Sequence, residues 1–347
     1  MSSRDYSLQS AMRPKPLTWL FHGLLLFVTF LTCTVAGCLW PFGYLGFGSD
    51  SAGAGAGAET YSELIASIPH LPIYYAVFVF ESIQAVFGNT ANLSYGMTYA
   101  AAVLFILVSH EMGHYIACRL YGVHATLPFF IPTPPLVGPA GTMGAFIRIV
   151  SPMPSRKAVF DIGVAGPLAG FFAMIPVSII MILTLTQAPP ISEPMPPGSE
   201  TIIFTDPIWI HLLAAIKGID LSQPILPNPF YSATWLGLLV TALNLIPSGQ
   251  LDGGHAIYAV FGEKFHRWTG RIAFVVMAML SISGLVFFNS PAGLLFALIL
   301  AFMMRVGHPR PADNEPLDKK RIAIAILTFI VFVLCFAPFP IRILYAS

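Results

Sequence analysis

The chain has 347 residues, of which 56% are hydrophobic and only 10% are charged, and its net charge is +1. A soluble domain carries about 25% charged residues, so this composition excludes an ordinary water-soluble protein and indicates one that crosses the membrane several times. The near-neutral charge gives no indication of a nucleic-acid partner. The four cysteines lie in or beside apolar runs without a CxxC pair, which is typical of packing residues and not of a disulfide framework.

Apolar runs recur along the chain at lengths that suit membrane helices, which need about 20 residues to cross the hydrocarbon core. The predicted spans are 17–40, 96–118, 158–186, 232–247, 271–288, 291–306 and 321–338. The first is too long for the apolar core of a cleaved signal peptide, and we interpret it as a retained helix. The fourth is short, and Asn244 and Pro247 interrupt it. We therefore expect an all-α polytopic membrane protein with about six to seven transmembrane helices.

The distribution of basic residues predicts the orientation, because cytoplasmic loops carry an excess of lysine and arginine. With the N-terminus in the cytoplasm, all 17 basic residues except Lys217 and Arg342 lie in or beside cytoplasmic segments. The external loop 41–95 then contains a flexible Ser/Ala/Gly tract at 51–58 and an apolar stretch at 65–87. This stretch is either an interfacial helix or an extra span, and the charge distribution argues against the extra span.

The second predicted span contains the sequence His110-Glu111-Met112-Gly113-His114, an HExxH motif. Residues four apart lie on one face of a helix, so the two histidines can present their imidazoles to one metal ion. Glu111 lies next to them and can accept a proton from a water molecule. This is the chemistry of zinc hydrolases. Ionisable side chains inside a membrane helix are costly, which favours a functional role over packing.

A catalytic zinc site takes three protein ligands, so a further carboxylate or histidine is needed. Asp252 is the best candidate, since Pro247 breaks the helix before it and Gly253 and Gly254 allow irregular backbone after it. The alternative is that Asp252 is a turn residue before the two glycines. His255 is a candidate fourth ligand, although a supporting or structural role is favoured.

These motifs resemble those of a known family. HEMGH in one membrane helix, followed by Asn244, Pro247 and Leu251-Asp252-Gly253 in a later one, resembles the site-2 protease family of intramembrane zinc metalloproteases. The segments 141–145 (GTMGA) and 161–170 (DIGVAGPLAG) are similar to the family's central motifs, and the resemblance covers about residues 95–310. The external segment 187–230 is too short for a PDZ domain, so the layout resembles the PDZ-less bacterial and plastid members.

The resemblance implies that His110, His114 and Asp252 bind one Zn²⁺ per chain and that Glu111 is the general base. Asn244 would help to hold the substrate or to stabilise the oxyanion. It further implies hydrolysis of peptide bonds within or near transmembrane segments of membrane proteins, with or without a prior cut by another protease. The partners are then a transmembrane substrate and the lipid bilayer.

Two further segments have predicted roles around this site. Residues 145–150 read as a short strand after the turn at 141–144, and the resemblance implies a membrane-associated β-hairpin near the active site. An open strand edge there can pair with an unwound substrate, and a plain cytoplasmic loop is the alternative. Gly163, Gly166 and Gly170 recur on one helix face, which we expect to pack on the second span and fix the histidines.

The chain divides into an N-terminal part at 1–95, a metalloprotease core at 96–310 and a C-terminal part at 311–347. The orientation favours the bacterial inner membrane, with the N-terminus and the active site on the cytoplasmic side. One alternative is a zinc protease that faces the cytosol and cuts soluble or prenylated chains. The others are a metal transporter and a scaffold without catalysis. The presence of Glu111 argues against these two, since neither needs a base beside the histidines.

Overall fold

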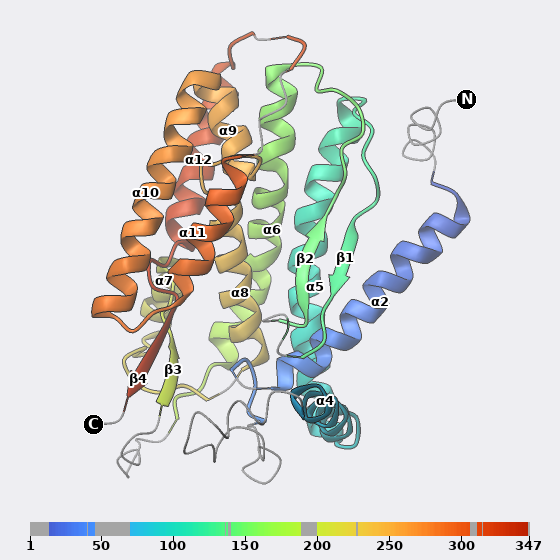
Figure 1. Ribbon diagram of the computed structural model, residues 1–347, viewed down its shortest axis with the longest axis vertical. Helices are drawn as coiled ribbons and strands as arrows, with labels where there is room; N and C mark the ends of the chain where they lie inside the picture. The colour runs from blue at the N-terminus through green and yellow to red at the C-terminus, as the bar shows by residue number, and fades with distance from the viewer. Residues whose placement is uncertain are drawn as a thin grey trace.

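The computed structural model describes residues 14–39, 41–45, 70–135, 137, 140–188, 200–226, 228–305, 311–313 and 315–345. Within these ranges the protein is mostly helical, with ten helices and two small two-stranded sheets (Figure 1). The predicted helical class is therefore confirmed, but the chain is not all-α, because a second sheet accompanies the expected hairpin. The Ser/Ala/Gly tract at 51–58 lies outside the described residues.

Four helices are long and apolar enough to cross a membrane, judged by length and composition: α2 (Pro16–Cys38), α5 (Thr90–Leu120), α6 (Arg156–Thr184) and α10 (Glu263–Phe287). Each coincides with a predicted span. The other three predicted spans form shorter helices: α8 (Pro229–Asn244), α11 (Ala292–Met303) and α12 (Lys319–Cys335). The helix α8 stops at Asn244, close before Pro247, since the residue that precedes a proline is disfavoured in helical conformation.

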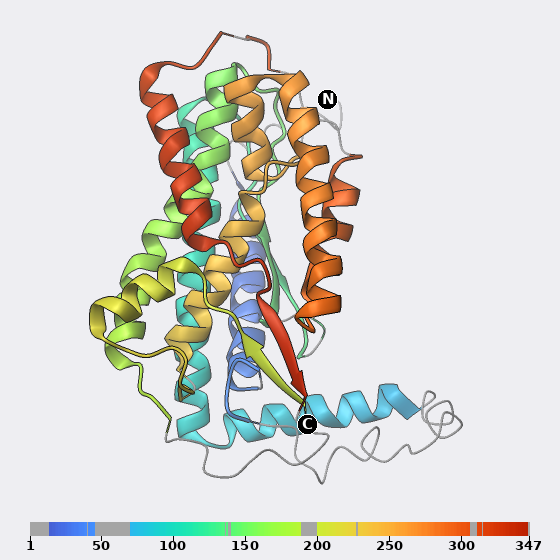
Figure 2. The same ribbon diagram turned by 90° about the vertical axis from the view of Figure 1, so that its left-hand side faces the viewer.

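The apolar stretch predicted at 65–87 forms helix α4 (Leu71–Phe87), which has 17 residues. Figure 2 shows α4 lying across one end of the bundle, at a steep angle to the long helices. It ends shortly before Asn89, whose side chain caps the start of α5 by accepting hydrogen bonds from the Ala91 and Asn92 backbone N–H groups. The direction of α4 agrees with the interfacial-helix alternative and not with an extra span.

Helix α6 packs against α5 on one side and against α8 and α9 (Asp252–Phe261) on another. Small residues allow the close approach of α5 and α6: a Cβ atom on Gly113 would lie 2.4 Å from the carbonyl oxygen of Ala165. Gly166 and Gly170 face the α5 histidines, as predicted. The prediction is wrong for Gly163, which faces His255 of α9, because the α6 face turns toward a different neighbour one helical turn earlier.

A β-hairpin lies along the bundle beside α5 (Figure 1). Strand β1 (Phe129–Pro132) pairs antiparallel with β2 (Thr142–Phe146). The predicted strand at 145–150 thus begins three residues earlier and ends four residues earlier, and Gly144 of the predicted turn lies inside it with φ +97°. The pairing continues past β2, since Ala125 and Ile149 form an antiparallel bridge.

Helix α2 holds this hairpin from its outer side. The His22 Nδ1–H group donates a hydrogen bond of 2.7 Å to the carbonyl oxygen of Pro128. Thr32 Oγ1 donates one of 2.6 Å to the carbonyl oxygen of Gly141, which has φ +76°. A Cβ on Gly141 would lie 2.4 Å from the Thr32 carbonyl oxygen, so glycine is required at this contact.

The two ends of the bundle differ in their connections. At one end, the Arg321 guanidinium of α12 donates to both carboxylate oxygens of Asp161 and to the Tyr121 hydroxyl, which ties α12 to α5 and α6. At the other end, strand β3 (Glu200–Phe204) pairs antiparallel with β4 (Ile341–Tyr345), beside helix α7 (Ile208–Lys217). This second sheet was not anticipated, because its strands are separated by more than 130 residues and neither carries a turn signal.

Candidate metal centre

The HExxH residues lie within helix α5 and are buried. The exposed fractions of His110, Glu111 and His114 are 5%, 5% and 7%. The Nε2 atoms of the two histidines are 3.2 Å apart. The four-residue spacing therefore brings both imidazoles to one point, as the sequence predicts.

Asp252 reaches the same point because the chain leaves the helical conformation between α8 and α9. A Cβ on Gly253 would lie 2.0 Å from the carbonyl oxygen of Leu245, so only glycine allows α9 to begin this close to the end of α8. Asp252 is the first residue of α9, where the partial positive charge of a helix N-terminus favours a carboxylate. The predicted broken helix is confirmed, and its function is to turn this carboxylate inward.

The three side chains fit a zinc ion. Asp252 Oδ2 lies 3.3 Å from His110 Nε2 and 3.4 Å from His114 Nε2. Ligand atoms placed about 2.0–2.1 Å from a tetrahedral zinc are about 3.3–3.4 Å apart, which matches these separations. Two imidazole nitrogens and a carboxylate oxygen also form a donor set that zinc binds. Among the described residues, these three form the group of His, Cys, Asp or Glu side chains that could hold a metal, and His255 is not a member.

Helix α6 supports the histidines from behind. The His114 Nδ1–H group donates a hydrogen bond of 2.7 Å to the carbonyl oxygen of Ile162, which leaves the Nε2 lone pair for a metal. A Cβ on Gly166 would lie 2.0 Å from His114 Nε2, and one on Gly170 would lie 3.2 Å from His110 Cβ. The two glycines therefore leave the space that the imidazoles occupy.

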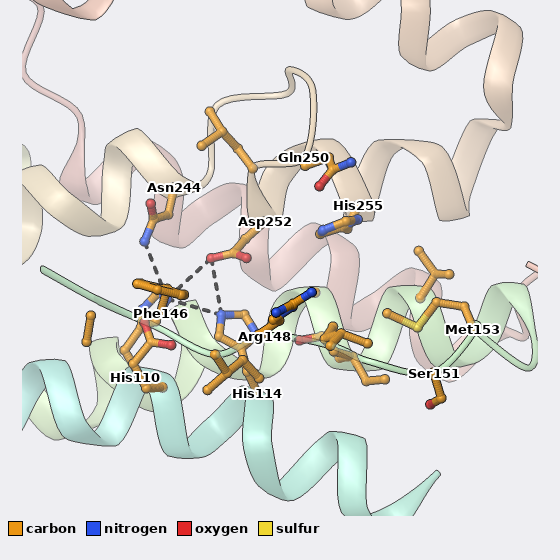
Figure 3. A pocket seen from close by; sticks show the side chains of 18 of the residues that line it. His110, His114, Phe146, Arg148, Ser151, Met153, Asn244, Gln250, Asp252 and His255 are labelled. Atoms are coloured by element: carbon orange, nitrogen blue, oxygen red, sulfur yellow. Dashed lines mark hydrogen bonds and ion pairs between the residues drawn. The ribbon is translucent and has the colours of Figure 1, made fainter. Parts of the chain in front are cut away.

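Glu111 and Asn244 complete the group of predicted site residues. Asn244 is the last residue of α8, and its Nδ2 lies 3.3 Å from His110 Nε2. Glu111 lines the same pocket as Ile147, just beyond β2. Together with the three candidate ligands they line a pocket of about 680 Å³, in which Figure 3 shows Asn244, His110, His114 and Asp252 converging.

His255, for which the sequence favoured a supporting role, lines the pocket without joining the metal group. Sequence reasoning missed two other residues near this pocket. His266 donates a hydrogen bond of 3.0 Å from Nε2 to the Gly249 carbonyl oxygen, and so holds the loop between α8 and α9. Arg148 lines the pocket too, although its sequence position only marked it as one of many basic residues. These roles depend on which segments lie opposite, and no local motif signals them.

The chain thus combines four candidate membrane spans with a His–His–Asp group that could hold a metal ion, which is the pattern of a metalloprotein with membrane helices. A family model described as Peptidase family M50 matches residues 98–287, which is more than half of the chain. The chain therefore belongs to this family of zinc metalloproteases, and the resemblance to site-2 proteases is confirmed.

Named relatives of this chain come from plants. It is 30% identical over 273 residues to the probable zinc metalloprotease EGY2, chloroplastic, of Oryza sativa subsp. indica, covering 75% of this chain and 46% of that protein. The Arabidopsis thaliana EGY2 protein is 27% identical over 265 residues, which cover 75% of this chain and 45% of that protein. The probable zinc metalloprotease EGY1, chloroplastic, of Oryza sativa subsp. japonica is 31% identical over 241 residues, with coverages of 67% and 39%. The chain spans about half the length of the curated relatives it matches.

Proposed function

We propose that this chain is an intramembrane zinc metalloprotease that hydrolyses peptide bonds within or near transmembrane segments of membrane proteins. One observation carries the proposal: ligand atoms of His110, His114 and Asp252, from two separate segments, lie 3.2–3.4 Å apart with Glu111 in the same pocket. Membership of Peptidase family M50 supports it.

The site residues have distinct roles in this reaction. His110, His114 and Asp252 would hold Zn²⁺, which when bound polarises a peptide carbonyl and makes a water molecule more acidic. Glu111 accepts one proton from the attacking water as the water oxygen bonds to the carbonyl carbon. The same carboxyl then gives that proton to the amide nitrogen as the C–N bond breaks.

Asn244 stabilises the charge that develops during this attack. Its side-chain N–H group lies beside His110 and points into the pocket (Figure 3), where it can donate a hydrogen bond to the oxyanion. A helical substrate hides its peptide bonds in its own hydrogen bonds, so it must unwind before cleavage. Substrates with glycine or proline near the scissile bond should therefore be preferred.

Charge and helix direction support a membrane arrangement. Basic residues gather at the bundle end that carries the first turns of α6, α10 and α12, which we assign to the cytoplasm together with the N-terminus. The shorter helices α8, α11 and α12 then join the four long ones in a six- to seven-helix embedded part, and α4 lies in the opposite interface. The metalloprotease core corresponds to 96–310, between the parts 1–95 and 311–347.

The membrane that this arrangement fits is the bacterial inner membrane. The names of the relatives raise a chloroplast membrane as the alternative, with the stroma in place of the cytoplasm. Fusing a reporter that is active only in the cytoplasm to the loop at 311–318 tests the orientation. An inactive fusion on this loop would reverse it.

The test of the activity compares the wild type with Glu111→Gln in lipid nanodiscs. We expect about one zinc per chain in both proteins, by elemental analysis, and cleavage of single-span membrane proteins by the wild type alone. Cleavage by a zinc-loaded Glu111→Gln variant would refute the role of Glu111. A folded wild type without zinc would favour a scaffold, and zinc flux into proteoliposomes would favour a transporter.

A further inference from the structure

Arg148 is a cation in the wall of the candidate active-site pocket. It lines this pocket together with the metal group, and Figure 3 labels it beside His114 and His255. The part of the chain that the structure describes offers its guanidinium no carboxylate and no hydrogen-bond acceptor. An unpaired cation in a pocket is a ready binding group for an anion.

Neighbouring cations at the same end of the bundle differ from Arg148 in this respect. The Arg156 guanidinium donates to the carbonyl oxygens of Ala259 and Val260, and Arg321 pairs with Asp161. Those arginines hold helices together. Within the described residues, the Arg148 side chain joins no elements, so its position calls for another explanation.

The backbone of Arg148 is fixed, which gives the side chain a defined origin. Its N–H group donates to Thr126 Oγ1 at 2.9 Å, and its carbonyl oxygen accepts from the Thr126 N–H at 3.0 Å. The preceding residue, Ile147, lines the same pocket as Glu111. The extended segment just beyond β2 therefore carries the cation along the pocket that holds the proposed base.

The extended segment that continues from β2 places Arg148 relative to the reacting bond. Side chains two apart lie on the same face of a strand, about 7 Å apart. Phe146 and Arg148 are both exposed pocket residues, whereas the residues between and beside them are half-buried. Phe146 and His110 line the same pocket, and Arg148 lies two residues farther along the chain than Phe146, toward the start of α6.

We propose that Arg148 determines specificity by binding an acidic side chain of the substrate, two to three residues from the scissile bond on the cytoplasmic side. This rests on the proposed protease function. With Zn²⁺ bound, the charges of Asp252 and Glu111 balance the metal, and Arg148 leaves the pocket with one positive charge. An acidic side chain that enters it neutralises this charge.

The experiment measures kcat/KM for matched membrane substrates that carry Glu, Gln or Lys at one position, scanned from the first to the sixth residue on the cytoplasmic side. For the wild type we expect the Glu substrate to exceed the Gln substrate about tenfold at the second or third position. Arg148→Gln should bring the ratio to about one, and Arg148→Glu should invert it in favour of Lys. Arg305→Gln, which removes an exposed cation outside the pocket, is the matched control and should keep the wild-type ratio.

Two results would overturn the proposal by showing attraction to the charged membrane surface. One is a preference for Glu over Gln that is equal at every substrate position. The other is a preference that Arg305→Gln reduces as much as Arg148→Gln does. Binding of the uncleaved substrates to Glu111→Gln, with and without Arg148→Gln, gives a second readout that needs no turnover. If the wild type cleaves none of the series, the proposed protease function fails. The ratio of the binding affinities for the Glu and Gln substrates then tests the role of Arg148 alone. If Arg148→Gln leaves this ratio unchanged, the role of Arg148 is refuted.

Discussion

The helix pairs α5–α6 and α10–α11 are both apolar but differ in their surroundings. In an apolar 18-residue stretch of each helix, 44% of the α5 stretch and 50% of the α6 stretch are buried, whereas only 28% of the α10 stretch is buried. The mean hydropathy of the α10 stretch, 2.0, nevertheless lies between those of α5, 1.6, and α6, 2.1. Hydropathy thus identifies membrane helices without telling which of them enclose a site.

Contacts between glycines and candidate ligands distinguish the enclosed pair. Gly166 and Gly170 of α6 face the imidazoles of α5, so a methyl group on Gly166 would collide with His114. The close glycine contact between α10 and α11 involves no such ligand, since a Cβ on Gly293 would lie 2.8 Å from Ser281 Cα. The outer face of α10 instead carries large exposed side chains, such as Met279 and Phe287. A lipid-facing surface tolerates changes of shape, and a surface that shapes a metal site does not.

The largest expected effect follows from Gly166→Ala. The new methyl group would lie 2.0 Å from His114 Nε2, so the imidazole must leave its position and the zinc content should fall to near zero. Gly23→Ala on α2 is the control, because nothing lies within 4 Å of its Cβ position. Elemental analysis of the two folded variants, with a thermal melt before and after chelation, measures the difference. Full zinc occupancy in Gly166→Ala would contradict the packing argument.

A somewhat smaller effect is expected for Gly253→Ala. Its methyl group would meet the Leu245 carbonyl oxygen at 2.0 Å, which displaces Asp252 but leaves both histidines in place. Zinc affinity should fall about 10- to 100-fold, the range found when the support of a ligand is lost. Competition with a zinc-sensitive dye measures the dissociation constant. An affinity equal to that of the wild type would show that Asp252 is not held by this turn.

Gly170→Ala should have an intermediate effect, since its methyl group would lie 3.2 Å from His110 Cβ, a contact that small shifts can relieve. We expect a loss of zinc affinity of a few-fold, together with a gain of helix propensity of about 1 kcal/mol at this position. The same dye competition ranks it between Gly253→Ala and Gly23→Ala. A loss as large as that of Gly166→Ala would mean that the two glycines are equivalent and that the distances do not rank the contacts.

The smallest effect is expected on the outer helix pair. Phe287 is 77% exposed, so Phe287→Leu should change the free energy of unfolding by less than about 0.5 kcal/mol and leave zinc binding unaltered. Reversible denaturation in mixed micelles measures this. A loss of zinc in this variant would show that α10 belongs to the site and would end the contrast between the two helix pairs.

Much of the site could be predicted because its chemistry is local in sequence. The spacing of His110 and His114 places them on one helix face, and the occurrence of Pro247 and Gly253 close together in the sequence predicts the broken helix. The start of the strand could be predicted only to within three residues and its end to within four, because the partner strand and the α2 contacts at Pro128 and Gly141 decide where pairing occurs. The β3–β4 sheet was not predictable, since it joins segments distant in sequence.

The sequence by itself determined the candidate membrane helices, the residue types of the candidate metal site and the helix that carries the proposed base, because composition and periodicity act over a few residues. Only the tertiary structure decided that Asp252 meets both histidines, that Gly163 turns toward α9 and that Arg148 lies unpaired in the pocket wall. Such facts depend on which helices are neighbours, and burial of apolar surface selects neighbours from contacts spread over the whole chain.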